Sequence, residues 1–446
     1  MTPNKSSTFR ATLKQELPAW LQEGIVTEEA AQHLSTRYEL DNLSKESSGL
    51  LAAVIFTLGG LLLGGGLLSF VAANWEEIPT FAKIALLFTT LLTFHGVGYW
   101  LWHHKGRSRL GHALVFTGSL VFGANIGLMA QIFHVSGEWY GLFGAWALGS
   151  LVMAYAARSW ITGLLALVNA VIWLLGISED HHNAWIAGSP LLIAAVFLPL
   201  AWQLRSRVLY AATFVGFTVT LCSLAEHQFR SFRYLLITLV ICGFTTWAAG
   251  EFHRVKNIRP EFGNPLAGLG ILALGVISYL WSFHEWWDVQ SWPNRSTANA
   301  PTFYWLLPTG IAALAGLALI VLMLQEINAL PTRRLLAVGI TLASGILVVC
   351  ALLGIAHRGD QMLLTLAVNL AALIIAAVAI AIGIMDERRA AFWVGSLFMV
   401  LLIITRFLEY ETSLLLKSAA FTLCGLAMIT AGMAYEKHLL RKEAHG

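Results

Sequence analysis

Long apolar runs separated by short polar connections make up most of the chain. From about residue 50 onward these runs are roughly 17 to 25 residues long, the length that an α-helix needs to cross a bilayer. They lie near 50–73, 80–102, 110–133, 139–157, 160–177, 185–203, 208–225, 234–250, 266–284, 303–324, 335–356, 362–384, 390–408 and 414–435. The pattern predicts an all-α fold, a polytopic transmembrane helix bundle of about 14 spans.

Composition supports a membrane protein. Hydrophobic residues make up 57% of the 446 positions and charged residues 12%, whereas an ordinary soluble domain has about 25% charged residues. Such a chain cannot bury its apolar surface and still present a polar exterior to water. We therefore expect the lipid bilayer to be its main partner, and we expect no nucleic-acid partner.

The placement of basic residues predicts the orientation. If the N-terminus is cytoplasmic, the cytoplasmic connections hold most of the 28 Lys and Arg residues, as the positive-inside rule requires. The loops on the other side hold Arg230, Arg233, Arg295 and Arg358. Adding or removing one span would reverse every later loop. We predict a multi-pass protein of the bacterial inner (plasma) membrane with both termini cytoplasmic.

Residues 1–49 are polar and mixed in charge, and they predict a short cytosolic N-terminal helical hairpin. Thr27 is a good N-cap for its second helix, and Glu28 and Glu29 follow where the helix dipole favours negative charge. The predicted domains are this hairpin, a transmembrane bundle over 50–436 and a cytosolic tail over 437–446. The hairpin either packs on the bundle or docks a protein partner.

One group of polar residues interrupts the apolar pattern near the predicted outer face. It consists of Asn74, Glu76, Glu77, Lys83, Asn125, Gln131, His134 and Glu138. Spacings of three and four place Gln131, His134 and Glu138 on one helical face, unless Ser136 and Gly137 end the helix. These candidate binding residues either line a functional pathway, because polar groups are costly inside a bundle, or form hydrogen bonds that fix two hairpins.

A second candidate group lies in the last hairpin and consists of Arg406, Glu409 and Lys417. Arg406 and Glu409 are three residues apart and can pair on one face of a helix. The simpler interpretation of this group is an ion pair at the membrane interface.

Sequence motifs of known chemistry are absent. The chain contains no P-loop, GxSxG, HExxH or CxxC pattern, and its 14 histidines form no HxxH, HxxxH or HxxHH box. His103 and His104 are predicted inside and His181 and His182 outside, so they cannot share a metal. We predict no metal, no cofactor and no catalytic residue, and whether the protein is an enzyme stays open.

Several stretches resemble a known family. LQEGIVTEEAAQHL, AANWEEIP, GANIGLMAQIFHVSGEWYGLFGAWAL and AARSWITGLLAL are similar to bacterial predicted membrane proteins of the domain of unknown function 2157. The resemblance covers about residues 15 to 170 and implies a bacterial inner-membrane protein, without an activity or substrate.

Three classes of function remain. The first is a transporter or flippase-like permease with a polar site near the outer face. The second is a non-transporting sensor or assembly protein that docks a partner through residues 1–49. The third is a membrane-embedded enzyme on a lipid-linked substrate, with His134 as general base near Glu138.

Overall fold

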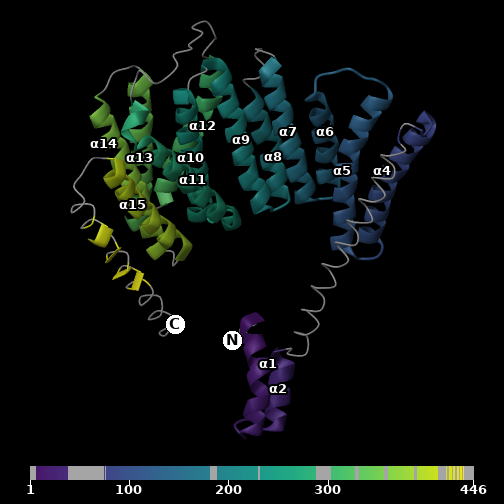
Figure 1. The fold of residues 1–446 in the computed structure, drawn as a ribbon, viewed down its shortest axis with the longest axis horizontal. Helices are drawn as coiled ribbons and strands as arrows, with labels where there is room; N and C mark the ends of the chain where they lie inside the picture. The colour runs from purple at the N-terminus through teal and green to yellow at the C-terminus, as the bar shows by residue number, and fades with distance from the viewer. Residues whose placement is uncertain are drawn as a thin grey trace. The chain divides into compact units, whose positions relative to one another are not determined.

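The computed structural model describes residues 7–38, 75, 77–180, 188–229, 232–287, 303–326, 331–355, 360–385 and 389–409, with single positions between 418 and 435. All regular structure in these ranges is helical. The helices are α1 (Ser7–Gln22), α2 (Glu28–Tyr38), α4 (Thr80–His103), α5 (Ser108–Ile132), α6 (Gly141–Ala156), α7 (Trp160–Asp180), α8 (Ser189–Gln203), α9 (Arg207–Phe229), α10 (Phe232–Val255), α11 (Pro260–Trp281), η2 (His284–Trp287), α12 (Phe303–Glu326), α13 (Pro331–Ile355), α14 (Gln361–Met385) and α15 (Arg389–Glu409) (Figure 1).

The apolar runs predicted between 80 and 408 correspond one by one to α4–α15. Ten described helices are long and apolar enough to cross a membrane, while α6 and α8 have only 16 and 15 residues. The predicted run at 50–73 lies outside the described residues, and so does most of the run at 414–435. The all-helical class is confirmed, and the total of about 14 spans stays a prediction.

The chain divides into two compact units, Met1–Leu86 and Leu87–Gly446. In the first unit, α1 and α2 bury Leu13, Leu17 and Ala31 against each other. Gly24 lies between them at a φ of 70°, a left-handed conformation that glycine adopts without steric cost. The Thr27 hydroxyl accepts a hydrogen bond from the backbone N–H of Ala30 at 3.4 Å, as expected of the N-cap of α2.

In the second unit, close packing depends on glycine where α10 crosses α11. A Cβ at Gly250 would lie 2.3 Å from the backbone nitrogen of Ala267, and one at Gly270 would lie 2.4 Å from that of Trp247. Without side chains at these positions the two backbones can approach closely, as small residues allow in membrane helix pairs. Trp247 itself is 1% exposed and belongs to the main core.

Two helix pairs, α6–α7 and α8–α9, are joined by turns of the same design. Arg158 and Arg205 each adopt a left-handed conformation just after a helix ends, with φ of 48° and 50°. The next residue in each turn is a serine whose hydroxyl caps the following helix. Ser159 accepts from the N–H of Thr162 at 3.4 Å, and Ser206 accepts from the N–H of Leu209 at 3.2 Å.

Candidate functional site

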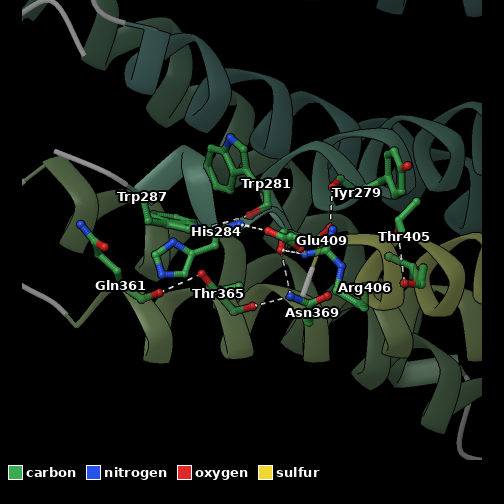
Figure 2. A network of polar contacts seen from close by, with 12 residues as sticks. Tyr279, Trp281, His284, Trp287, Gln361, Thr365, Asn369, Thr405, Arg406 and Glu409 are labelled. Carbon is green, nitrogen blue, oxygen red and sulfur yellow. Dashed lines mark hydrogen bonds and ion pairs between the residues drawn. The ribbon is translucent and has the colours of Figure 1, made fainter. Parts of the chain in front are cut away.

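A buried polar network surrounds the end of α11 (Figure 2). Ser282 is the C-cap residue of α11, and its carbonyl is one of the acceptors that a helix end leaves without an intrahelical partner. Asn369 of α14 donates its Nδ2–H to this carbonyl at 3.0 Å, and Arg406 of α15 donates from Nη1 to the same oxygen. Three helices therefore meet at one carbonyl oxygen.

The same network contains an ion pair on α15. Arg406 and Glu409 form the pair that their spacing of three residues predicts, and their side chains are only 17% and 15% exposed. Glu409 also accepts the backbone N–H of His284, the first residue of η2, at 2.6 Å. The guanidinium of Arg406 lies over the ring of Phe283, 4.3 Å from its centroid. The pair therefore holds both sides of the α11–η2 connection.

Part of the Arg406 guanidinium takes no part in this network. Its Nε and Nη2 atoms are buried, and they donate to no acceptor in the part of the chain that the structure describes. Buried donors without a protein partner are rare in proteins and are most often explained by water, an ion or a ligand. Arg406 is therefore the polar side chain in this region that is best placed to contact something other than protein.

An apolar groove lies between α11, α14 and α15, with a volume of about 690 Å³. Its walls are small and aliphatic side chains, among them Gly268, Ala379 and Val394. Arg389 and Arg254 line one end of the groove, where α15 begins and α10 ends, and Arg254 is ion-paired with Glu251 of its own helix. Tyr279 lines the opposite end.

The Tyr279 end of this groove leads to the polar network. The rings of Tyr279 and Phe283 are in edge-to-face contact with centroids 5.3 Å apart, and Phe283 carries the guanidinium of Arg406 on its face. Figure 2 draws Tyr279 and Arg406 in the same polar network. One groove thus has arginine side chains lining one end and a further arginine just beyond the other.

The polar group predicted near the outer face, from Asn74 to Glu138, has members in both compact units of the chain. Asn74, Glu76 and, from the second group, Lys417 lie outside the described residues. Glu77 is exposed, and Lys83, one turn into α4, places its ammonium 5.1 Å from the centroid of the Trp75 ring. Asn125 donates its Nδ2–H to the carbonyl of Leu87 at 2.9 Å, which links α5 to α4.

The end of α5 separates the remaining members of this group. Helix α5 stops at Ile132, before either Ser136 or Gly137, so Gln131, His134 and Glu138 do not share one helical face as predicted. The N–H of His134 bonds the carbonyl of Gln131 and the N–H of Val135 bonds that of Ala130. These are the two bonds of a Schellman motif, with His134 at its left-handed position.

Exposure and contacts argue against close cooperation of these side chains. Gln131, His134 and Glu138 are all exposed. Within the described ranges no hydrogen bond or ion pair joins His134 to Glu138, and no three His, Cys, Asp or Glu side chains come together as a metal site requires. Trp146 of α6 fixes this hairpin instead, because its ring packs on Gly123 of α5 and its Nε1–H donates to the carbonyl of Ser119 at 2.8 Å.

The helices and their apolar surfaces define a polytopic α-helical membrane protein. Residues 18–163 match the family model described as Predicted membrane protein (DUF2157), which confirms the resemblance seen in the sequence. The comparisons with curated proteins and with solved structures found no match. The groove between α11, α14 and α15 lies outside the matched segment.

Sequence reasoning missed the groove and the tertiary partners of Arg406. The groove walls are apolar residues of α11 and of the later consecutive helices α14 and α15, and their sequence pattern does not differ from that of residues that face lipid. Ser282 contributes a backbone carbonyl, which carries no sequence signal. The arginines at positions 254 and 389 were visible only as members of basic connections.

Proposed function

We propose that the protein is a flippase-like permease for an anionic lipid, and that the lipid's apolar chain occupies the groove between α11, α14 and α15. The observation that carries the proposal is the combination of an apolar wall with exposed Arg389 at one end, beside the ion pair of Arg254 and Glu251. Arginine binds phosphate groups through a planar, always charged guanidinium, and an acyl chain needs an apolar wall beside it. The groove offers both in one place.

The dimensions of the groove support this proposal. The α11 residues that line it run from Ala267 to Tyr279, which at 1.5 Å per residue is about 18 Å along the helix axis. This is more than half of the roughly 30 Å hydrocarbon core of a bilayer. An acyl chain lying along the groove would reach from the arginines almost to Phe283.

The Arg406 network supports movement rather than storage of the lipid. A phosphate that leaves Arg254 and Arg389 needs a second favourable position near the other membrane face, because charge is costly in between. Arg406 supplies buried guanidinium N–H groups one aromatic ring beyond the groove. In the proposed orientation, Arg254 and Arg389 lie at the cytoplasmic face and Arg406 at the outer face.

The test uses the full chain reconstituted in liposomes that contain a trace of fluorescent phosphatidylglycerol. Dithionite bleaches the label in the outer leaflet, so the rate of loss of the protected fraction reports transbilayer movement. Phosphatidylethanolamine with the same chains and label serves as the substrate control, since its headgroup has no net charge. We expect faster movement of phosphatidylglycerol in the presence of the protein.

A groove-filling variant makes the test specific. A Cβ at Gly268 meets nothing within 4 Å, so Gly268→Phe places a ring in the groove without an initial clash. Gly345→Phe is the matched control, because Gly345 is also an open helical position and lies outside the groove. We expect Gly268→Phe to abolish movement and Gly345→Phe to retain it. Equal rates for the two variants would overturn the proposal.

A second candidate function is partner docking through the N-terminal unit. Helices α1 and α2 form their own small core, yet Ile25 in the connection between them remains 65% exposed and Leu21 is 37% exposed. Deleting residues 1–49 separates the two functions. A permease core would keep lipid movement, whereas a docking protein would lose its partner. The enzyme hypothesis has less support, because exposed His134 and Glu138 do not contact each other.

A further inference from the structure

A second groove lies between α8, α9, α10 and α12, with a volume of about 430 Å³. It shares no lining residue with the groove that contains Arg254 and Arg389. Its walls are mostly apolar, and Tyr210 and His253 lie together at one end. The tyrosine ring is held in place by a stacked contact with Phe262, whose ring centroid lies 4.4 Å away.

Hydrogen bonding determines which atom of the Tyr210–His253 pair carries the shared proton. His253 Nδ1 lies 2.5 Å from the carbonyl oxygen of Ile258, and a carbonyl only accepts, so Nδ1 must carry the ring's proton. In the neutral imidazole the other nitrogen, Nε2, is then an acceptor. Tyr210 must therefore donate its hydroxyl proton to Nε2, at 3.2 Å. Towards a ligand in the groove, the oxygen of Tyr210 can therefore act only as a hydrogen-bond acceptor.

The threonine side chains that line this groove have the same property. Each donates its hydroxyl proton to a helix carbonyl one turn earlier, at 2.7 or 2.8 Å. The donors and acceptors are Thr213 and Leu209, Thr218 and Phe214, Thr245 and Ile241, and Thr246 and Cys242. The hydroxyl oxygens of the groove thus present acceptors to whatever lies in it.

We propose that this groove binds a long-chain lipid alcohol whose hydroxyl group donates a hydrogen bond to the oxygen of Tyr210. A ligand that offers only acceptors would face the oxygen lone pairs of Tyr210 and the four threonines, with the indole N–H of Trp202 as a donor beside them, and no Lys or Arg among the described lining residues would attract an anion. The lining residues of α10 run from Cys242 to His253, about 16 Å of helix at 1.5 Å per residue. This length suits an extended alkyl or isoprenoid chain.

The test is a competition between two probes that differ only in the donor. The purified full chain in detergent is incubated with an equimolar mixture of 1-hexadecanol and hexadecyl methyl ether, and native mass spectrometry gives the ratio of the two bound forms. We expect the wild type to prefer the alcohol about three- to tenfold, the usual net effect of one hydrogen bond. An equal ratio in the wild type would overturn the proposal.

Variants locate the preference in this groove. The double variant Tyr210→Phe/His253→Leu removes both the tyrosine oxygen and the imidazole nitrogen that would otherwise accept in its place, and it should bring the ratio to about one, whereas Tyr99→Phe on α4 should leave the preference unchanged. Ala315→Phe fills the groove from an exposed position and should reduce binding of both probes. Retained preference in Tyr210→Phe/His253→Leu, or undiminished binding in Ala315→Phe, would place the alcohol elsewhere. Because the two grooves are separate, these outcomes are independent of lipid movement through the first groove.

Discussion

Arg406 donates a hydrogen bond from Nη1 to the carbonyl oxygen of Ser282, a residue 124 positions earlier in the chain. This contact connects the last described long helix to the end of α11, and Glu409 extends it to the backbone of His284. A charged donor on a carbonyl at a helix end is stronger than a neutral one. The contact therefore stabilises the arrangement of α11, α14 and α15, on which the groove between these helices depends.

Removing Arg406 alone should be more harmful than removing the whole pair. Arg406→Leu leaves the Glu409 carboxylate largely buried without its partner, and we expect the free energy of unfolding to fall by about 3 kcal/mol. The double variant Arg406→Leu/Glu409→Leu leaves no unpaired charge and should lose less. Unfolding in mixed micelles with increasing denaturing detergent measures both. Equal losses in the single and double variants would show that the charge pair has no such role.

Two glycine-to-alanine changes should have opposite signs. A Cβ at Gly123 would lie 2.2 Å from Cε2 of Trp146, so Gly123→Ala must displace the indole and should destabilise the protein by about 1 to 3 kcal/mol. A Cβ at Gly96 of α4 meets nothing within 4 Å, and Gly96→Ala should stabilise the helix by up to about 1 kcal/mol. The unfolding midpoints of the two variants, each compared with that of the wild type, test these two predictions. Two shifts of the same sign would contradict the packing of α5 on α6.

Replacing His134 by glycine should stabilise the hairpin between α5 and α6. His134 has a φ of 51°, where a Cβ costs roughly 1 kcal/mol and glycine has no such cost. His134→Ala removes the imidazole but keeps the Cβ, and it should leave stability unchanged. If both variants lose lipid movement in liposomes, the imidazole has a function beyond ending the helix. Retained movement with a higher unfolding midpoint in His134→Gly alone identifies a purely conformational role.

The serine caps of α7 and α9 should both stabilise the protein, and Ser159 should contribute more because it also accepts from the buried hydroxyl of Thr162 at 3.0 Å. Ser206→Ala removes the hydroxyl that accepts from Leu209, and Ser159→Ala removes the one that accepts from Thr162. Loss of an N-cap typically lowers the free energy of unfolding by about 1 kcal/mol. Ser136→Ala, at an exposed position outside any helix, is the control and should be neutral. Denaturing-detergent titrations give the unfolding midpoint of each variant. A midpoint equal to that of the wild type in Ser159→Ala or Ser206→Ala would contradict the capping role of that serine.

More of the fold than of the candidate site could be predicted from the sequence, for physical reasons. Helices α4–α15 could be predicted because each carries a continuous apolar run, and the Arg406–Glu409 pair because a spacing of three residues lies on one helical face. The end of α5 was predicted near residue 133, but its cause was not, because a histidine rather than a glycine occupies the left-handed position that stops the helix. Both grooves were missed because their walls come from several helices and their acceptor character depends on where each hydroxyl proton points.

The matching turns at Arg158–Ser159 and Arg205–Ser206 have a consequence for motion. In each turn the arginine has a left-handed conformation, and the serine that follows it is hydrogen-bonded to the next helix. Neither residue is therefore free to change its backbone angles as a hinge would require. The pairs α6–α7 and α8–α9 should therefore behave as stiff bodies. Relative movement of these two pairs should therefore occur by sliding or tilting at the contact between α7 and α9, and not by bending of either turn.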